Sequence, residues 1–211
     1  MMRTAKSWWV PLVALLAMLG SGTWWVAQAD DFGHGGATGG SMRGGYSGSE
    51  WLAGESNPVD GLAGARDRAE EYAAVLGPDL RVGEVMRFTK NYYAELEELD
   101  GTMATEILVD PSTGAVRLEF GPAMMWNTRY GMMSRAGAPD ELTPEQAEQA
   151  AQEWADDHGG LTVADAEAFP GYYTLHTLKQ RRIEGMLSVN AVTGDVWDHS
   201  WHGEFQAMSE N

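Results

Sequence analysis

The chain has 211 residues, a formal net charge of −17, 26 glycines and no cysteine. So acidic a surface repels the phosphates of nucleic acids and of anionic lipid head groups, which argues against nucleic acid as a partner. The lack of cysteine excludes disulfides, thiolate metal sites, cysteine nucleophiles and a lipid-modified amino-terminal cysteine.

Residues 1–29 have the pattern of a secretory signal peptide. Arg3 and Lys6 precede an apolar run, and small residues then lead to Ala27-Gln28-Ala29, which is typical of a cleavage site. This pattern predicts a secreted or periplasmic protein. The alternative is an uncleaved membrane anchor, because residues 8–26 are long enough to span and carry Trp pairs at both ends.

Residues 30–57 are rich in Gly and Ser and contain few apolar side chains. This composition predicts a flexible tether between the signal and the folded part of the chain.

Two amphipathic helices are expected further along. Residues 62–76 place apolar side chains at helical spacing, and Gly77-Pro78 ends the pattern. Residues 144–158 follow Thr143, which together with Gln146 forms a T-x-x-Q capping box. The two helical sequences align best when residues 69–73 are placed on residues 151–155.

Each helix is followed by segments with the alternation and turn residues of antiparallel strands. The expected strands lie near residues 83–98, 103–110 and 115–120, and again near residues 171–179, 183–190 and 195–201. A single alignment without gaps places Tyr92-Tyr93 on Tyr172-Tyr173 and Thr113-Gly114 on Thr193-Gly194.

The repeat predicts an α+β fold of two similar units in tandem, each with one helix and a three-stranded antiparallel sheet. The units are expected at residues 58–120 and 142–205, with a Met-rich connector at 121–141 and a tail at 206–211.

The second hairpin of each unit carries a recognisable motif, ILVDPSTGAV at residues 107–116 and LSVNAVTGDV at residues 187–196. With the preceding helices, these segments resemble the PepSY family over about residues 60–120 and 142–205. The second copy departs from the motif, since Asn190-Ala191 replaces Asp-Pro. The resemblance implies a secreted or membrane-associated, non-catalytic module that is often attached to peptidases or acts on them.

The chain offers no compelling catalytic constellation, so we expect that it is not an enzyme. Ser188 and Ser200 lack the setting of a nucleophile elbow, and no H-E-x-x-H motif occurs. Glu95 and Glu97 share a strand face in a regular strand, and this face is most simply solvated. A hydrolase is therefore the least favoured class.

His199 and His202 form an H-x-x-H pair after the last expected strand. If a regular strand continued through Trp201, the two rings would lie on opposite faces, whereas a bend at Gly203 could bring them together. A continued strand would place Trp197, His199 and Trp201 on one face, and we predict that this aromatic surface binds a partner. Its residues, with those of the connector, are Trp197, His199, Trp201, Trp126 and Tyr130.

The connector contains four methionines, Met124, Met125, Met132 and Met133, around an aromatic centre. Thioethers either fill irregular gaps in packing or bind soft metals, so two hypotheses remain open. The favoured one is a secreted, non-enzymatic module without a cofactor that binds a protein partner in the cell envelope, a peptidase being one candidate. The alternative is a periplasmic copper-handling protein that uses these methionines with His199 and His202. The membrane is a partner only if residues 1–29 remain as an anchor.

Overall fold

The computed structural model describes residues 58–132 and 142–209, and all of them belong to one compact unit. The expected signal or anchor at 1–29, the tether at 30–57 and Met133 lie outside the described residues. Among the described residues, no helix is both long and apolar enough to cross a membrane.

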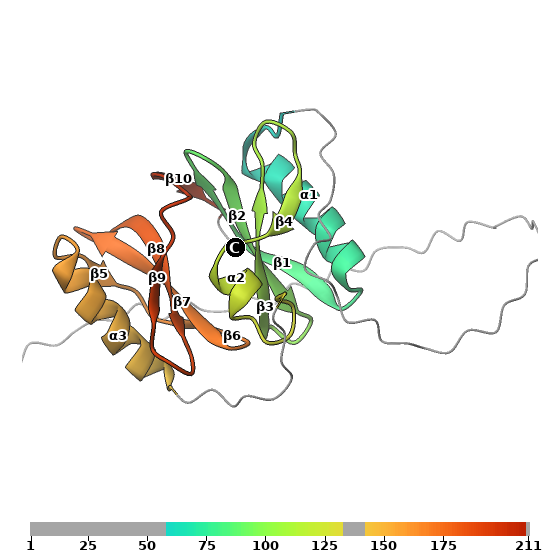
Figure 1. Ribbon diagram of the computed structural model, residues 1–211. Helices are drawn as coiled ribbons and strands as arrows, with labels where there is room; N and C mark the ends of the chain where they lie inside the picture. The colour runs from blue at the N-terminus through green and yellow to red at the C-terminus, as the bar shows by residue number, and fades with distance from the viewer. Residues whose placement is uncertain (1–57, 133–141, 210–211) are drawn as a thin grey trace, which may run out of the picture. The chain divides into compact units, whose positions relative to one another are not determined.

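The first sheet has five antiparallel strands in the order β10-β1-β2-β3-β4. Its strands are β1 (Leu80–Phe88), β2 (Tyr92–Glu98), β3 (Met103–Val109), β4 (Val116–Leu118) and β10 (Phe205–Met208). Helix α1 (Gly61–Leu76) covers one face, because its apolar stripe of Ala65, Ala69 and Ala73 packs against β2 and β3 (Figure 1). Small side chains on this stripe let the helix approach the sheet closely.

The second sheet is also antiparallel, in the order β5-β7-β8-β9, with β6 pairing to β7 as well. Its strands are β5 (Thr162–Val163), β6 (Glu167–Phe169), β7 (Tyr172–Lys179), β8 (Arg182–Asn190) and β9 (Val196–Asp198). Helix α3 (Pro144–Asp157) covers it through Ala147 and Ala151 (Figure 1). The predicted capping box between Thr143 and Gln146 is present at the start of α3.

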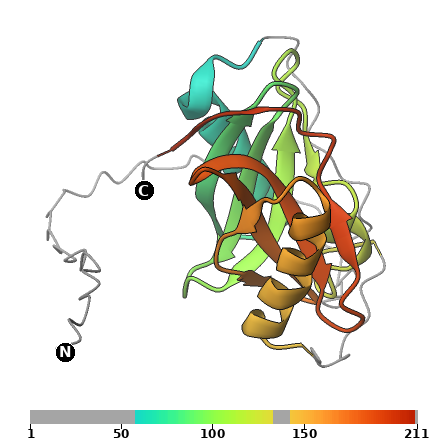
Figure 2. The same ribbon diagram turned by 90° about the vertical axis from the view of Figure 1, so that its left-hand side faces the viewer.

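An α+β fold with antiparallel sheets is therefore confirmed, but each sheet has five strands rather than three. The segment expected as one strand at 83–98 is divided into β1 and β2. A tight turn at residues 89–91 divides it, where the Phe88 N–H donates to the Asn91 carbonyl at 2.9 Å. The segment expected as a tail contributes β10, which pairs with β1 at the edge of the first sheet (Figure 2).

The buried faces of the strands refine the alignment between the two halves. In β2, Tyr92 and Leu96 face the helix side, whereas in β7 this side is taken by Tyr173 and Leu175. By its face, Tyr92 thus corresponds to Tyr173 rather than to Tyr172. A slip of one residue exchanges the two faces of a strand, so Tyr172 points away from α3 and packs with Phe169.

The faces turned away from the helices pack against each other. One buried cluster joins Met86, Phe88, Tyr93 and Leu108 of the first sheet to Met186 of the second. Short helix α2 (Pro122–Met125) lies between the two halves in the chain, and its Ala123 packs on Phe169 and Tyr172. The interface between the sheets is thus a core in its own right, and polar residues buried there are cut off from water.

The crossing from β9 to β10 depends on Gly203, which has a φ of +79°. A Cβ there would overlap the Thr89 hydroxyl, so Gly203→Ala combines backbone strain with overpacking and should lower the free energy of unfolding by about 2–4 kcal/mol. Gly159→Ala is the matched control, because its φ is +102° but nothing lies within 4 Å of the added carbon. We expect it to cost only about 1 kcal/mol in urea unfolding. Equal costs for the two variants would contradict the tight crossing.

Candidate metal centre

The two halves each place one polar residue directly after their last strand. Glu119 follows β4 in the first half, and His199 follows β9 in the second. Their backbones are held alike, because the Glu119 N–H donates to the Glu106 carbonyl at 2.9 Å and the His199 N–H donates to the Met186 carbonyl at 3.1 Å. Corresponding positions in the two sheets therefore meet at the interface.

His202 joins this pair through a turn. Strand β9 ends at Asp198, and the His202 N–H donates back to the His199 carbonyl at 3.2 Å. The regular strand that would have placed His199 and His202 on opposite faces ends at Asp198. The turn at residues 199–202 brings the two rings together, and it precedes Gly203, where the bend had been expected.

Three ligand atoms converge at this point. Glu119 Oε1 lies 3.2 Å from His199 Nδ1 and 2.8 Å from His202 Nε2. Among residues 58–132 and 142–209, this is the only group of three or more His, Asp or Glu whose ligand atoms all lie within 4.8 Å of one another. The site is closed, because the exposed fractions of Glu119, His199 and His202 are 0%, 3% and 1%.

Hydrogen bonds on the outer side of each ring orient the imidazoles. The Asn91 amide nitrogen donates to the Trp201 carbonyl at 3.3 Å, which leaves Asn91 Oδ1 to accept from His202 Nδ1 at 2.8 Å. In the neutral ring with its proton on Nδ1, His202 Nε2 presents a lone pair toward Glu119. His199 Nε2 lies 3.0 Å from the Ser188 hydroxyl, which in turn contacts Thr174 at 2.9 Å. Partners of this kind orient the histidine ligands of metals.

The inner nitrogens are close to the carboxylate without being hydrogen-bonded to it. Within the described part of the chain, His199 Nδ1, His202 Nε2 and Glu119 Oε2 have no hydrogen-bond partner. Metal–ligand bonds of about 2.0–2.1 Å separate neighbouring ligands of a tetrahedral ion by about 3.3 Å. The observed separations of 3.2 and 2.8 Å fit either a proton shared with the carboxylate or an ion held between the three atoms.

The carboxyl of Glu119 is held in its charged form by the imidazoles beside it. Burial opposes ionisation of Glu119, but the neighbouring imidazoles outweigh it and hold the pKa of the carboxyl below its usual range. Burial lowers the pKa of His202, which favours its neutral form. A buried carboxylate beside a neutral imidazole needs a positive charge, which either a shared proton or a metal ion can supply.

Glu119 is the last of four glutamates in a row across the inner face of the first sheet. Glu95 pairs with Glu106 in register, and the Glu84 N–H donates to Glu95 Oε2 at 3.3 Å. Burial, followed by repulsion from Glu167, raises the pKa of Glu84 to about 7 and that of Glu95 to about 10.

The third member of the row, Glu106, is also held as an acid. Burial raises its pKa well above the usual value, and the Tyr93 hydroxyl donates to it at 2.8 Å. Glu95 and Glu106 are therefore neutral acids at pH 7, so Glu119 alone of this row has a lowered pKa. Glu95 had been expected on a solvated face but is only 4% exposed, because its side of β2 faces the second sheet.

The aromatic residues expected to bind a partner are divided between three places. Trp126 and Trp197 meet edge to face with ring centroids 5.4 Å apart. Trp201 instead stacks on His199 at 4.6 Å, and its indole N–H donates to Glu119 Oε1 at 3.2 Å. Tyr130 lies apart from both, with its hydroxyl 3.5 Å from Glu98.

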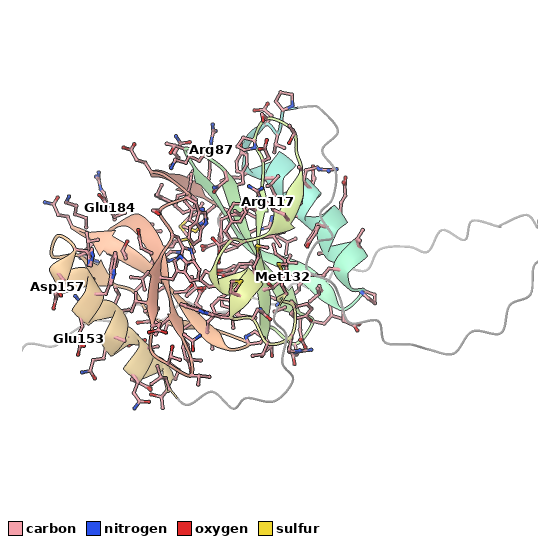
Figure 3. All side chains as sticks on the ribbon, viewed as in Figure 1. Arg87, Arg117, Met132, Glu153, Asp157 and Glu184 are labelled. Atoms are coloured by element: carbon pink, nitrogen blue, oxygen red, sulfur yellow. The ribbon has the colours of Figure 1, made fainter. Side chains whose placement is uncertain are left out.

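The described methionines of the connector lie elsewhere. Met124 packs against the core under α1, whereas Met125 and Met132 are exposed; Figure 3 labels Met132.

Glu119 is the candidate ligand that the sequence patterns did not indicate. The gapless alignment of the two halves could have pointed to it, since it places Glu119 on His199.

The buried acid Glu95 predicts the pH dependence of the metal-free protein. Its pKa is raised in the folded state, so the fold holds a proton that the unfolded chain releases above a pH of about 4.3. The contribution of Glu95 to the free energy of unfolding is therefore greatest below that pH and falls as the pH rises toward 10. Between pH 5 and 8, the wild type should lose on the order of 1–3 kcal/mol more than Glu95→Gln. The exposed Glu70→Gln serves as control in urea unfolding with chelator, and a Glu95→Gln profile parallel to the wild type would refute a neutral Glu95.

Comparison with protein-family models, with curated proteins and with solved structures finds no match for this chain. The resemblance to the PepSY family therefore stays a prediction, and the case for function depends on the geometry of Glu119, His199 and His202.

Proposed function

We propose that this protein is a non-enzymatic metal-binding protein of the cell envelope that holds one divalent ion between its two halves. The observation that carries the proposal is the convergence of Glu119 Oε1, His199 Nδ1 and His202 Nε2 in a buried site where both nitrogens lack a hydrogen-bond partner among the described residues. Two imidazoles and one carboxylate are a common ligand set for transition metals in proteins.

The ligand set favours Zn²⁺ and similar borderline ions. Mg²⁺ and Ca²⁺ prefer shells made of oxygen, and two imidazole nitrogens do not meet that preference. The second oxygen of Glu119, which has no hydrogen-bond partner in the described structure, is available as a further ligand. Closed sites are typical of structural ions, whereas catalytic ions keep a position open to substrate, so we assign the ion a structural role.

Duplication of one unit explains why the ligands meet. We infer that the two halves descend from one module, because α1 and α3 bury alanines at the same spacing and because Glu119 and His199 occupy matching positions after β4 and β9. The PepSY-like hairpins and the signal-like sequence at 1–29 support an envelope location.

A second candidate function, binding of a protein partner in the envelope, is favoured by a different observation. Trp126 and Trp197 contact each other, and Phe120, Met125 and Trp197 are exposed. Clustered exposed aromatic and Met side chains are typical of the centres of protein interfaces. This candidate does not compete with the metal centre, because the two use different residues.

The metal proposal predicts one tightly bound Zn²⁺ per chain in calorimetric titration at pH 7.5. Glu119→Gln, His199→Gln and His202→Gln should each weaken binding by at least about 100-fold, because loss of a mere supporting partner already costs 10–100-fold. Glu106→Gln is the matched control, as it removes a buried carboxyl from the same row.

Substitution of all four connector methionines by Leu separates this centre from the copper hypothesis. It should leave Zn²⁺ affinity unchanged, since no thioether belongs to the proposed ligand set. Failure of the parent protein to bind Zn²⁺, or equal affinity in the Glu119→Gln variant, would contradict the proposed centre.

A further inference from the structure

Trp201 reaches all three ligands of the proposed metal centre, on which this inference rests. Its indole ring stacks on His199, with the ring centroids 4.6 Å apart and an angle of 23° between the planes. The indole N–H donates to Glu119 Oε1 at 3.2 Å. The backbone carbonyl of Trp201 accepts from Asn91 at 3.3 Å, and Asn91 Oδ1 lies 2.8 Å from His202 Nδ1. One residue thus connects ligands from both halves of the chain.

The hydrogen bond from this indole determines how the carboxylate is presented. Glu119 Oε1 receives the indole N–H, whereas Glu119 Oε2 has no hydrogen-bond partner among the residues that the structure describes. An indole N–H is a donor only, so Glu119 must accept at Oε1. Hydrogen bonds of this kind hold ligating carboxylates in one orientation. Oε2 is therefore free to complete a shell of four protein atoms with Oε1, His199 Nδ1 and His202 Nε2.

Aromatic rings also close the space around the two imidazoles. Trp201 stacks on one side of His199, and Phe88 stacks on His202 with the ring centroids 4.4 Å apart. Both aromatic residues belong to the apolar cluster between the two sheets. An apolar shell controls the access of solvent to a metal site. Water is therefore kept from the sides of the centre that these two rings occupy.

Ions differ in how well they tolerate a dry shell of few ligands. Zn²⁺ is four-coordinate and tetrahedral in almost all structural sites. Mg²⁺ and Mn²⁺ prefer octahedral shells of oxygen, and Ni²⁺ favours square-planar or tetragonal shells. A centre that offers four protein atoms and excludes water therefore discriminates between ions by coordination number and geometry.

We propose that Trp201 is a positioning residue that makes the centre selective for a four-coordinate ion such as Zn²⁺. Its N–H fixes the Glu119 carboxylate so that Oε2 remains free for the ion, and its ring keeps water from the side of His199. Loss of these contributions lets water enter the shell, raises the coordination number and admits ions that require more ligands.

Trp201→Phe tests this role, because phenylalanine can keep a ring on His199 but has no N–H. In competition titrations of the full chain, the ratio of the Zn²⁺ affinity to the Ni²⁺ affinity should fall at least about tenfold, because Zn²⁺ loses more than Ni²⁺ does. A purely structural loss would weaken both ions alike and leave the ratio unchanged. Trp154→Phe is the matched control, since it makes the same exchange on α3, where the indole stacks on His158.

Co²⁺ in place of Zn²⁺ reports the shell directly, because its visible absorption is strong in a four-coordinate shell and weak in a six-coordinate one. The parent protein and Trp154→Phe should give the strong spectrum, and Trp201→Phe the weak one. An unchanged affinity ratio or an unchanged Co²⁺ spectrum in Trp201→Phe would overturn the role of Trp201 and leave the metal centre in place.

The parent protein alone supplies two further outcomes. A weak, six-coordinate Co²⁺ spectrum would contradict the dry shell, and with it the selectivity that we assign to Trp201. Absence of both Zn²⁺ and Co²⁺ binding would instead contradict the proposed centre of Glu119, His199 and His202 itself.

Discussion

The structure depends on one electrostatic constraint, a fully buried carboxylate, Glu119, that faces two imidazoles between two apolar layers. An ion that is removed from water must be neutralised nearby, or it weakens the fold. The outer nitrogen of His202 lies 2.8 Å from Asn91 Oδ1, so a neutral ring with its proton there turns a lone pair toward Glu119. The proposed divalent cation would satisfy all three groups at once and would join the ends of β4 and β9. The interface between the sheets is therefore expected to be strongest when the metal is bound.

The other glutamates in the row that ends with Glu119 differ from it in pKa because their neighbours differ. Glu95 and Glu106 share the inner face with Glu119 but have no imidazole within ion-pair distance among the described residues, and burial keeps them protonated near neutral pH. Glu84 is the member nearest to a third imidazole, with its Oε1 3.9 Å from His176 Nε2, too far for a ligand set. The ends of the two halves supply the proposed metal ligands, while the middle of the interface contains hydrogen bonds from hydroxyls such as that of Tyr93.

Much of the fold could be predicted from local patterns. The helical stripe in α1, the capping box of α3 and the turns after β3 and β8 are encoded within a few residues, and the structure contains each of them. The turn at residues 89–91 is marked in the sequence only by Lys90-Asn91, without the Gly or Pro that marks most turns. Strand β10 could not be predicted, because only its partner β1 creates it. Two of the three residues of the candidate metal centre could be predicted from the sequence. The H-x-x-H spacing indicated His199 and His202, but Glu119 is contributed by another sheet, and no local pattern marks a ligand so distant in the chain.

X-ray absorption of the zinc-loaded full chain tests the central claim most directly, because it reports the ligand atoms themselves. The account predicts a first shell of nitrogen and oxygen at about 2.0–2.1 Å, with outer-shell scattering from two imidazoles and without sulfur. A sulfur shell at about 2.3 Å would assign the ion to the connector methionines instead. An oxygen-only shell without imidazole scattering would show that Glu119, His199 and His202 do not hold the metal.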